Sequence, residues 1–146
     1  MKKKSAVKNK SIRRSVKKQH HDPFLEIRDS EIEGAGKGLF TTIERNAGDF
    51  ICYYEGDELN EKSLSRRYKN EKPIYVLKLK EDLYLDSRDH PHALARYINS
   101  NHNSGKKINC TYSIDRRTQL VSIKTTKYLL PNTELLIAYG RSHKIV

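Results

Sequence analysis

The chain has 146 residues, with 29 Lys or Arg against 18 Asp or Glu and a formal net charge of +11. This length predicts one domain with a modest hydrophobic core. Two cysteines, Cys52 and Cys110, are too few for a disulfide framework or a four-cysteine zinc site, so we expect reduced thiols and an intracellular protein. No apolar run is long enough for a membrane span or a signal peptide, so we expect no membrane association.

The positive charge is concentrated at the N-terminus. Residues 1–21 hold nine of the 29 basic residues and no acidic one, which leaves 20 basic against 18 acidic residues in the rest of the chain. Such a polar segment buries too little surface to offset the entropy of ordering it, so we predict a disordered tail over 1–22 and a folded domain over 23–146. The tail suits a nuclear localisation signal, an arm for nucleic-acid phosphates or a solubilising terminus equally well.

The folded part shows many short strand patterns and little helix. Gly34, Gly36 and Gly38 predict a tight turn between the first two strands, and Asn60 can cap a short helix that ends near Tyr68. No strand–helix–strand alternation occurs, which excludes a doubly wound nucleotide fold and indicates a mainly β protein. The predicted strands cover residues 24–28, 39–42, 50–56, 74–79, 83–86, 110–115, 119–124 and 134–140.

A polar bend follows the short apolar run that ends at Ala95. Asn99, Ser100, Asn101 and His102 can form hydrogen bonds but cannot build a core, so this segment reads as a turn with a functional role. The histidines of His90-Pro91-His92 have no nearby third ligand, and we therefore expect a loop there and no metal in the protein.

Three short motifs resemble those of the SET-domain protein lysine methyltransferases. They are Gly36-Lys37-Gly38, the segment Arg96-Tyr97-Ile98-Asn99 with Asn109-Cys110 after it, and the closing segment from Glu134 to Tyr139-Gly140. Their order and spacing match the family, and the resemblance spans about residues 24–140. It implies small curled β-sheets with short helices, a C-terminal segment that passes beneath the Asn99 bend as a pseudoknot, and S-adenosyl-L-methionine as the methyl donor.

The resemblance also implies roles for individual residues. Tyr139 takes the catalytic position and Tyr54 a second wall of the lysine channel; strand alternation sends Tyr53 to the opposite face. In an alternative alignment with the family motif, Asn101 is the donor-binding asparagine in place of Asn99, because His102 follows it directly. The residues expected to hold the donor are Gly36, Lys37, Gly38, Tyr75, Arg96, Asn99 and Ser100.

The chain departs from the family pattern in three places. Ser100 stands where a histidine is usual, and Ile137 stands where many members have Phe or Tyr to limit the number of methyl groups, so the degree of methylation stays open. Six residues follow Gly140, whereas many relatives complete the lysine channel with a zinc-bearing or helical segment. Small viral and bacterial relatives without such a segment are often dimers, which makes a homodimer one expected arrangement.

The function that the resemblance implies is methyl transfer from S-adenosyl-L-methionine to a protein lysine. We expect the substrate lysine in a histone or a histone-like basic tail, the chain's own N-terminus included, and a location in a cell or host nucleus. Two alternatives remain: a binding module that kept the fold and lost catalysis, and a nucleic-acid-binding protein that acts through residues 1–21.

Overall fold

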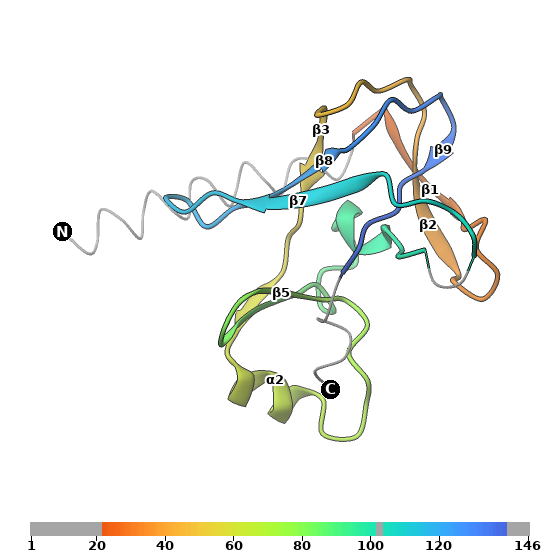
Figure 1. Ribbon diagram of the computed structural model, residues 1–146. Coiled ribbons are helices and arrows are strands. Elements are labelled where there is room, and N and C mark those ends of the chain that lie inside the picture. The colour runs from red at the N-terminus through yellow and green to blue at the C-terminus, as the bar shows by residue number, and fades with distance from the viewer. Residues whose placement is uncertain (1–21, 102–103, 140–146) are drawn as a thin grey trace.

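The computed structural model describes residues 22–101 and 104–139 (Figure 1). The predicted tail up to residue 21, His102 and Gly140 therefore lie outside the described residues. Three small antiparallel sheets make up the fold, in the strand orders β1-β2-β9, β3-β8-β7 and β4-β6-β5. The elements are β1 (Leu25–Asp29), β2 (Lys37–Thr41), β3 (Phe50–Tyr53), β4 (Asp57–Leu59), α2 (Glu61–Arg67), β5 (Val76–Lys80), β6 (Leu83–Asp86), the 3-10 helix η2 (Leu94–Tyr97), β7 (Cys110–Ile114), β8 (Val121–Thr125) and β9 (Thr133–Glu134).

The first sheet joins the beginning of the folded part to its end. β1 and β2 form the predicted hairpin, in which Gly34 and Gly36 adopt φ values of +79° and +71° that side chains disfavour. β9 then pairs with β2, with Glu134 opposite Phe40. The closing segment is therefore fixed beside the glycine turn, although some 95 residues separate the two along the chain.

The predicted strand over 50–56 is shorter in the structure: only Phe50–Tyr53 form a strand, β3, and the next strand, β4, belongs to a different sheet. β3 ends at Tyr53 and pairs with β8, whereas β4 begins at Asp57 and pairs with β6. Between the sheet of β3 and the sheet of β4 the chain passes through Gly56, where an added Cβ would lie 2.7 Å from the Asp86 carbonyl oxygen. The prediction of one strand was wrong because β-forming residues continue across a change of sheet that local sequence does not reveal.

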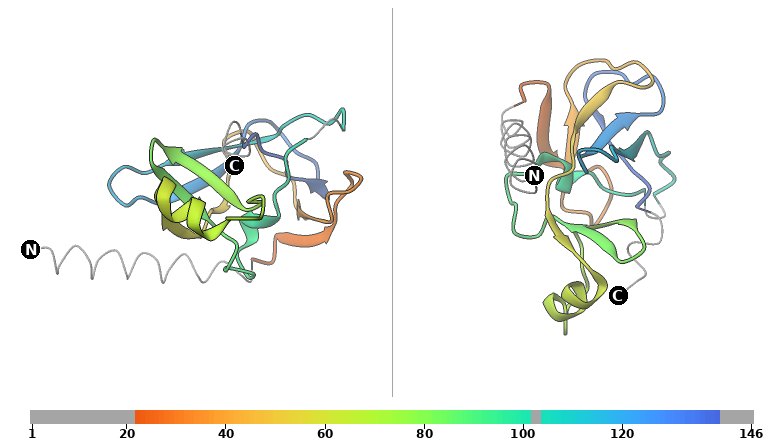
Figure 2. Two further views of the ribbon diagram at one scale, coloured as in Figure 1. Left: turned by 90° about the horizontal axis from the view of Figure 1, so that it is seen from below. Right: turned by 90° about the vertical axis from the view of Figure 1, so that its left-hand side faces the viewer.

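Residues 57–86, here called the insert, form a separate lobe below the other two sheets (Figures 1 and 2). The predicted helix is confirmed as α2, and its Asn60 cap accepts a hydrogen bond from the Ser63 backbone N–H at 2.8 Å. The strands predicted over 74–79 and 83–86 are present as β5 and β6, which pair as a hairpin. A small apolar cluster holds the lobe together, made of Leu64, Tyr68, Val76 and Tyr84 with Leu59 at its edge.

The closing segment passes between the two ends of the Asn99 bend. Only Thr133 and Glu134 belong to a strand, which corrects the predicted strand over 134–140. Beyond them, Leu136 forms a parallel bridge with Asn99 and Ile137 forms one with Cys110. This arrangement is the pseudoknot that the family resemblance implies.

The Asn109 side chain holds the closing segment at this crossing through two hydrogen bonds. Its amide donates to the Glu134 carbonyl at 2.9 Å, and its oxygen accepts from the Leu136 backbone N–H at 2.8 Å. The surrounding core is almost fully buried, with Leu39, Ile98, Ile123, Leu135 and Ile137 each at most 2% exposed. None of the helices within residues 22–101 and 104–139 is long and apolar enough to cross a membrane.

Replacing Asn109 tests whether these two hydrogen bonds stabilise the fold. We expect Asn109→Ala to lower the free energy of unfolding by about 3 kcal/mol, because it leaves one buried N–H and one buried C=O without partners. Urea unfolding measures this loss. The control is Asn101→Ala, at an exposed asparagine, which should stay within about 0.5 kcal/mol of the unmodified protein. Equal stability of the two variants would contradict the role assigned to Asn109.

Candidate active site

Tyr139 lies at the end of the closing segment and is buried, with 8% of its surface exposed. Its hydroxyl donates a hydrogen bond to the Ile98 carbonyl, directly before Asn99. Burial, together with the nearby thiols of Cys52 and Cys110, raises the pKa of the Tyr139 phenol well above its ordinary value. The structure thus brings a neutral phenol to the polar bend.

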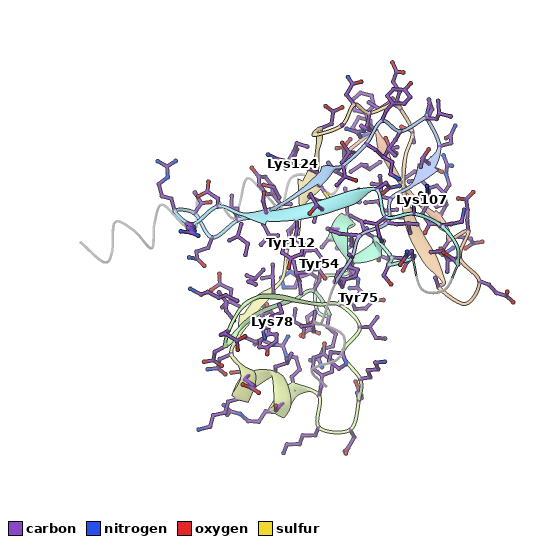
Figure 3. All side chains as sticks on the ribbon, viewed as in Figure 1. Tyr54, Tyr75, Lys78, Lys107, Tyr112 and Lys124 are labelled. Atoms are coloured by element: carbon purple, nitrogen blue, oxygen red, sulfur yellow. The ribbon has the colours of Figure 1, made fainter. Side chains whose placement is uncertain are left out.

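Tyr54 approaches the same region from the end of β3. It is 4% exposed, and its hydroxyl donates to the Tyr75 carbonyl at 3.0 Å. Burial and the nearby Tyr139 phenol raise the Tyr54 pKa as well. Tyr53 lies on the other face, where its ring packs edge-on against the exposed Phe50, so the predicted alternation is confirmed. In Figure 3, Tyr54 and Tyr75 lie where the insert meets the rest of the fold.

Asn99 connects the glycine turn to the closing segment. Its side-chain amide donates to the Lys37 carbonyl at 2.9 Å and to Glu134 Oε2 at 3.3 Å. Its own carbonyl accepts from the Ile137 backbone N–H at 3.0 Å. Asn99 therefore contacts two of the three motifs that the sequence separates.

Glu134 is a site residue that the sequence reasoning missed. Its carboxylate is buried, and it accepts from Ser30 Oγ at 2.7 Å and from the Glu31 backbone N–H at 2.8 Å, in addition to the Asn99 amide. A Cβ added to Gly38 would lie 2.3 Å from Glu134 Oε2, so any larger residue there would have to displace the buried carboxylate. The signal was present in the closing motif, where an acidic residue stands in an otherwise apolar run.

The Arg96 side chain packs on the Tyr75 ring. The Arg96 guanidinium lies 3.9 Å from the centre of the Tyr75 ring, and Arg96 Nη1 donates to the Ser87 and Arg88 carbonyls at 3.3 and 3.2 Å. Arg96 Nε and Ser100 Oγ are buried and have no hydrogen-bond partner among the described residues. Ser87 Oγ is a third such atom, and because buried polar atoms are normally paired, Arg96 Nε and Ser100 Oγ are candidates for contact with a ligand.

Two expected contacts take other partners. The Lys37 ammonium lies exposed in an ion pair with Asp29 at 2.6 Å, so only the main chain of Lys37 faces Asn99. The Asn101 side chain is also exposed and donates to the Lys106 carbonyl within its own loop. This geometry favours Asn99 over Asn101, although the assigned roles stay predictions.

The histidine pair is engaged in protein contacts. His90 Nε2 lies 2.9 Å from Asp57 Oδ1, and the described residues include no group of three His, Cys, Asp or Glu side chains able to hold a metal ion. A surface hollow at the start of α2 contains none of the predicted site residues; it is lined by Asn60, Glu61, Lys62, Ser65, Arg66 and Asp82.

Burial of the Tyr139 phenol has a measurable consequence above its ordinary pKa of 10. There the unfolded chain releases the phenolic proton while the folded chain keeps it, so the free energy of unfolding should fall as the pH rises. Tyr139→Phe should flatten this fall, and Tyr53→Phe, on the opposite face, serves as the control. Urea unfolding at a series of pH values provides the measurement, and identical slopes for Tyr139→Phe and the unmodified protein would contradict the assignment.

Comparisons with known proteins bear on the family and the fold of the chain. The family model described as SET domain matches residues 36–140. No curated protein sequence matches the chain. Among solved structures, a Polycomb Repressive Complex 2 from Chaetomium thermophilum bound to GSK126 superposes with a TM-score of 0.67 at 22% identity, covering 82% of this chain and 16% of that one.

A second structure, ctPRC2 in an autoinhibited conformation bound to S-adenosylmethionine, gives a TM-score of 0.68 at 22% identity. The match covers 82% of this chain and 15% of the other, so this protein corresponds in length to a small part of those chains. At this identity the likeness shows a shared fold, while the family model covers most of the sequence. The chain belongs to the SET-domain family.

Proposed function

We propose that this SET domain transfers a methyl group from S-adenosyl-L-methionine to a protein lysine. The observation that carries the proposal is the meeting of the Tyr139 hydroxyl with the Ile98 carbonyl, beside Asn99 and the unpaired atoms of Arg96 and Ser100. The family match and the likeness to a structure described as bound to S-adenosylmethionine support the choice of donor.

The residues present fit this donor. Arg96 Nε and Ser100 Oγ offer buried polar atoms without partners, and the Tyr75 ring offers an aromatic surface beside them. Asn99 and the main chain of Gly36, Lys37 and Gly38 would complete its surroundings, and the exposed Lys37 ammonium is available to a carboxylate if it leaves Asp29. When bound, the donor supplies an electrophilic methyl group on a positively charged sulfur.

The chain's own residues contribute to the reaction by favouring the neutral form of the substrate amine. A lysine has an ordinary pKa of about 10.4 and must lose its proton before nitrogen can form a bond to the methyl carbon. The buried rings of Tyr54 and Tyr139 exclude water, which disfavours the ammonium form and favours proton loss. With the donor bound, attack by the neutral amine would form the N–C bond as the S–C bond breaks and would give a neutral thioether and a methylated ammonium.

The two phenols keep the channel neutral. Each donates a hydrogen bond to a main-chain carbonyl and keeps its proton because its pKa is raised, so neither places a negative charge where it would favour the ammonium form. The hydroxyl oxygens remain able to accept hydrogen bonds from the amine. Ile137 is buried close to them in the closing segment and leaves the number of transferred methyl groups open.

As substrate we propose a lysine in a histone-like basic tail, with the chain's own residues 1–21 as a second source. A lysine-rich segment presents its amines on long side chains that can enter a narrow channel. A nuclear location in the cell or host follows from such a substrate. A homodimer is the arrangement we propose for completing the lysine channel.

A second candidate function is a binding module that has lost catalysis. The observation that favours it is Ser100, because its hydroxyl replaces the larger histidine ring usual in the family and has no partner among the described residues. The module would bind a basic tail without transferring a methyl group. The nucleic-acid alternative would act through residues 1–21, outside the described part of the chain.

The reaction is tested with isotopically labelled S-adenosyl-L-methionine and histones, or with the protein alone. We expect methyl-lysine to form and Tyr139→Phe to slow its formation at least about a hundredfold, because the variant removes a preorganised hydroxyl from the channel. The matched control is Tyr128→Phe, at an exposed tyrosine paired with Glu44. Binding without turnover in the unmodified protein would favour the module, and full activity of Tyr139→Phe would refute the catalytic role.

Measuring donor binding shows whether Asn99 or Asn101 is the donor-binding asparagine. We expect Asn99→Ala to weaken binding of S-adenosylhomocysteine at least about tenfold, because it releases the Lys37 carbonyl and the Glu134 carboxylate together. Asn101→Ala should leave the affinity unchanged. Titration calorimetry measures both variants, and the reverse pattern would establish Asn101 as the donor-binding residue.

A further inference from the structure

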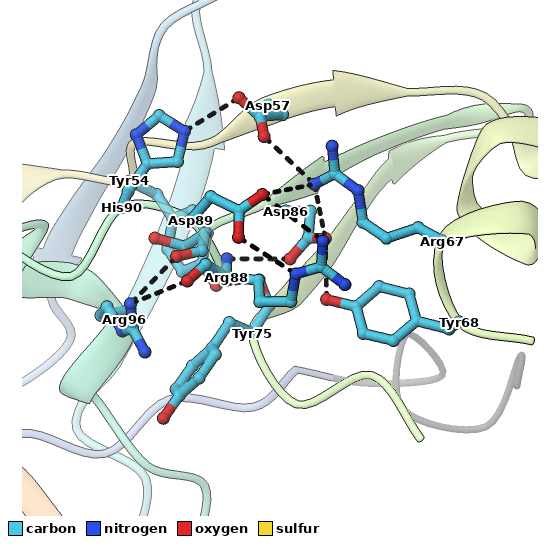
Figure 4. A network of polar contacts seen from close by, with 11 residues as sticks. Tyr54, Asp57, Arg67, Tyr68, Tyr75, Asp86, Arg88, Asp89, His90 and Arg96 are labelled. Atoms are coloured by element: carbon cyan, nitrogen blue, oxygen red, sulfur yellow. Dashed lines mark hydrogen bonds and ion pairs between the residues drawn. The ribbon is translucent and has the colours of Figure 1, made fainter. Parts of the chain in front are cut away.

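Asp86 is a buried carboxylate at the end of β6, and it is 0% exposed. Asp86 Oδ2 accepts hydrogen bonds from the Tyr68 hydroxyl at 2.7 Å and from Arg67 Nη1 at 3.0 Å (Figure 4). Asp86 Oδ1 accepts from the Arg88 backbone N–H at 3.0 Å. The carboxylate thus connects the end of α2 to the turn formed by residues 86–88, here called the 86–88 turn.

The 86–88 turn touches the candidate donor site through its main chain. Arg96 Nη1 donates to the carbonyls of Ser87 and Arg88. The Ser87 backbone N–H donates to the Tyr75 carbonyl at 2.9 Å, and the same carbonyl accepts from the Tyr54 hydroxyl. Three predicted site residues therefore depend on the position of this turn.

The turn is held on two sides. A buried carboxylate is costly unless its donors are all in place, so Asp86 fixes the backbone N–H of Arg88 relative to Arg67 and Tyr68. From the opposite side, Gly56 packs so closely on the Asp86 backbone that an added Cβ would lie 2.7 Å from its carbonyl oxygen. The turn has little room to shift while both contacts are kept.

We propose that Asp86 is a positioning residue that holds the 86–88 turn, and through the turn holds Arg96 against the Tyr75 ring. The inference rests on the proposed function, because the consequence is donor affinity. It also couples the insert to the donor site, since Arg67 and Tyr68 come from α2 and its C-terminal end. Asp86 itself contacts no predicted site residue through its carboxylate.

The first test is titration calorimetry of the full chain with S-adenosylhomocysteine. Asp86→Asn places an amide N–H₂ where a charged acceptor met Arg67 and Tyr68, so the turn should loosen and the affinity should fall roughly tenfold. The control is Asp115→Asn, which changes another carboxylate that accepts backbone N–H groups, in the distant β7–β8 turn. Its affinity should equal that of the unmodified protein, and thermal unfolding verifies that both variants are folded.

A double-mutant cycle separates positioning from a general loss of structure. Arg96→Lys keeps the charge but removes the planar group that lies over Tyr75 and reaches both carbonyls. If Asp86 acts through Arg96, adding Asp86→Asn to Arg96→Lys should weaken donor binding by less than twofold further. A merely structural role would give additive losses in binding.

If Asp86→Asn does not fold, Tyr68→Phe removes one donor to the carboxylate and should weaken donor binding by roughly threefold. Unchanged affinity in a folded Asp86→Asn or in Tyr68→Phe, or additive losses in the cycle, would overturn the positioning role while the proposed function stands. Failure of the unmodified protein to bind S-adenosylhomocysteine would overturn the proposed function and this inference together.

Discussion

The buried carboxylate of Glu134 is the contact on which the arrangement of the site depends. It receives hydrogen bonds from Ser30, Glu31 and Asn99, which lie at the glycine turn and at the polar bend. Gly38 leaves just enough space for it. Without these donors a buried carboxylate would be strongly unfavourable, so the closing segment can occupy its place only when the turn and the bend are already positioned.

The path of the closing segment through the Asn99 bend determines where Tyr139 lies. Asn109 pairs with the main chain on both sides of Leu135, and the parallel bridges at Asn99 and Cys110 guide the chain toward Tyr139. The phenol therefore reaches the Ile98 carbonyl as a consequence of main-chain pairing. Most of this pairing joins residues far apart in sequence, which predicts a slow folding step when the segment enters the bend.

Sequence patterns predicted the helix and the strands that depend on interactions between residues close together in the chain. Asn60 capped the expected helix, and the hairpins at β5–β6 and β7–β8 followed their alternation of apolar and polar residues. The break between β3 and β4 could not be predicted, because it depends on the packing of Gly56 against Asp86 from another strand. The pseudoknot came from the family resemblance alone, and the partners of Glu134 and Lys37 depend on tertiary contacts that no motif records.

The candidate site relies on main-chain acceptors. Tyr139, Tyr54, Asn99 and Arg96 each donate to backbone carbonyls, those of Ile98, Tyr75, Lys37, Ser87 and Arg88. A carbonyl can be supplied by any residue type, so the geometry depends on how the chain is routed more than on which side chains surround it. The use of carbonyls also bears on the proposed reaction, because a carboxylate beside a substrate amine would favour its unreactive charged form, whereas a carbonyl carries no net charge.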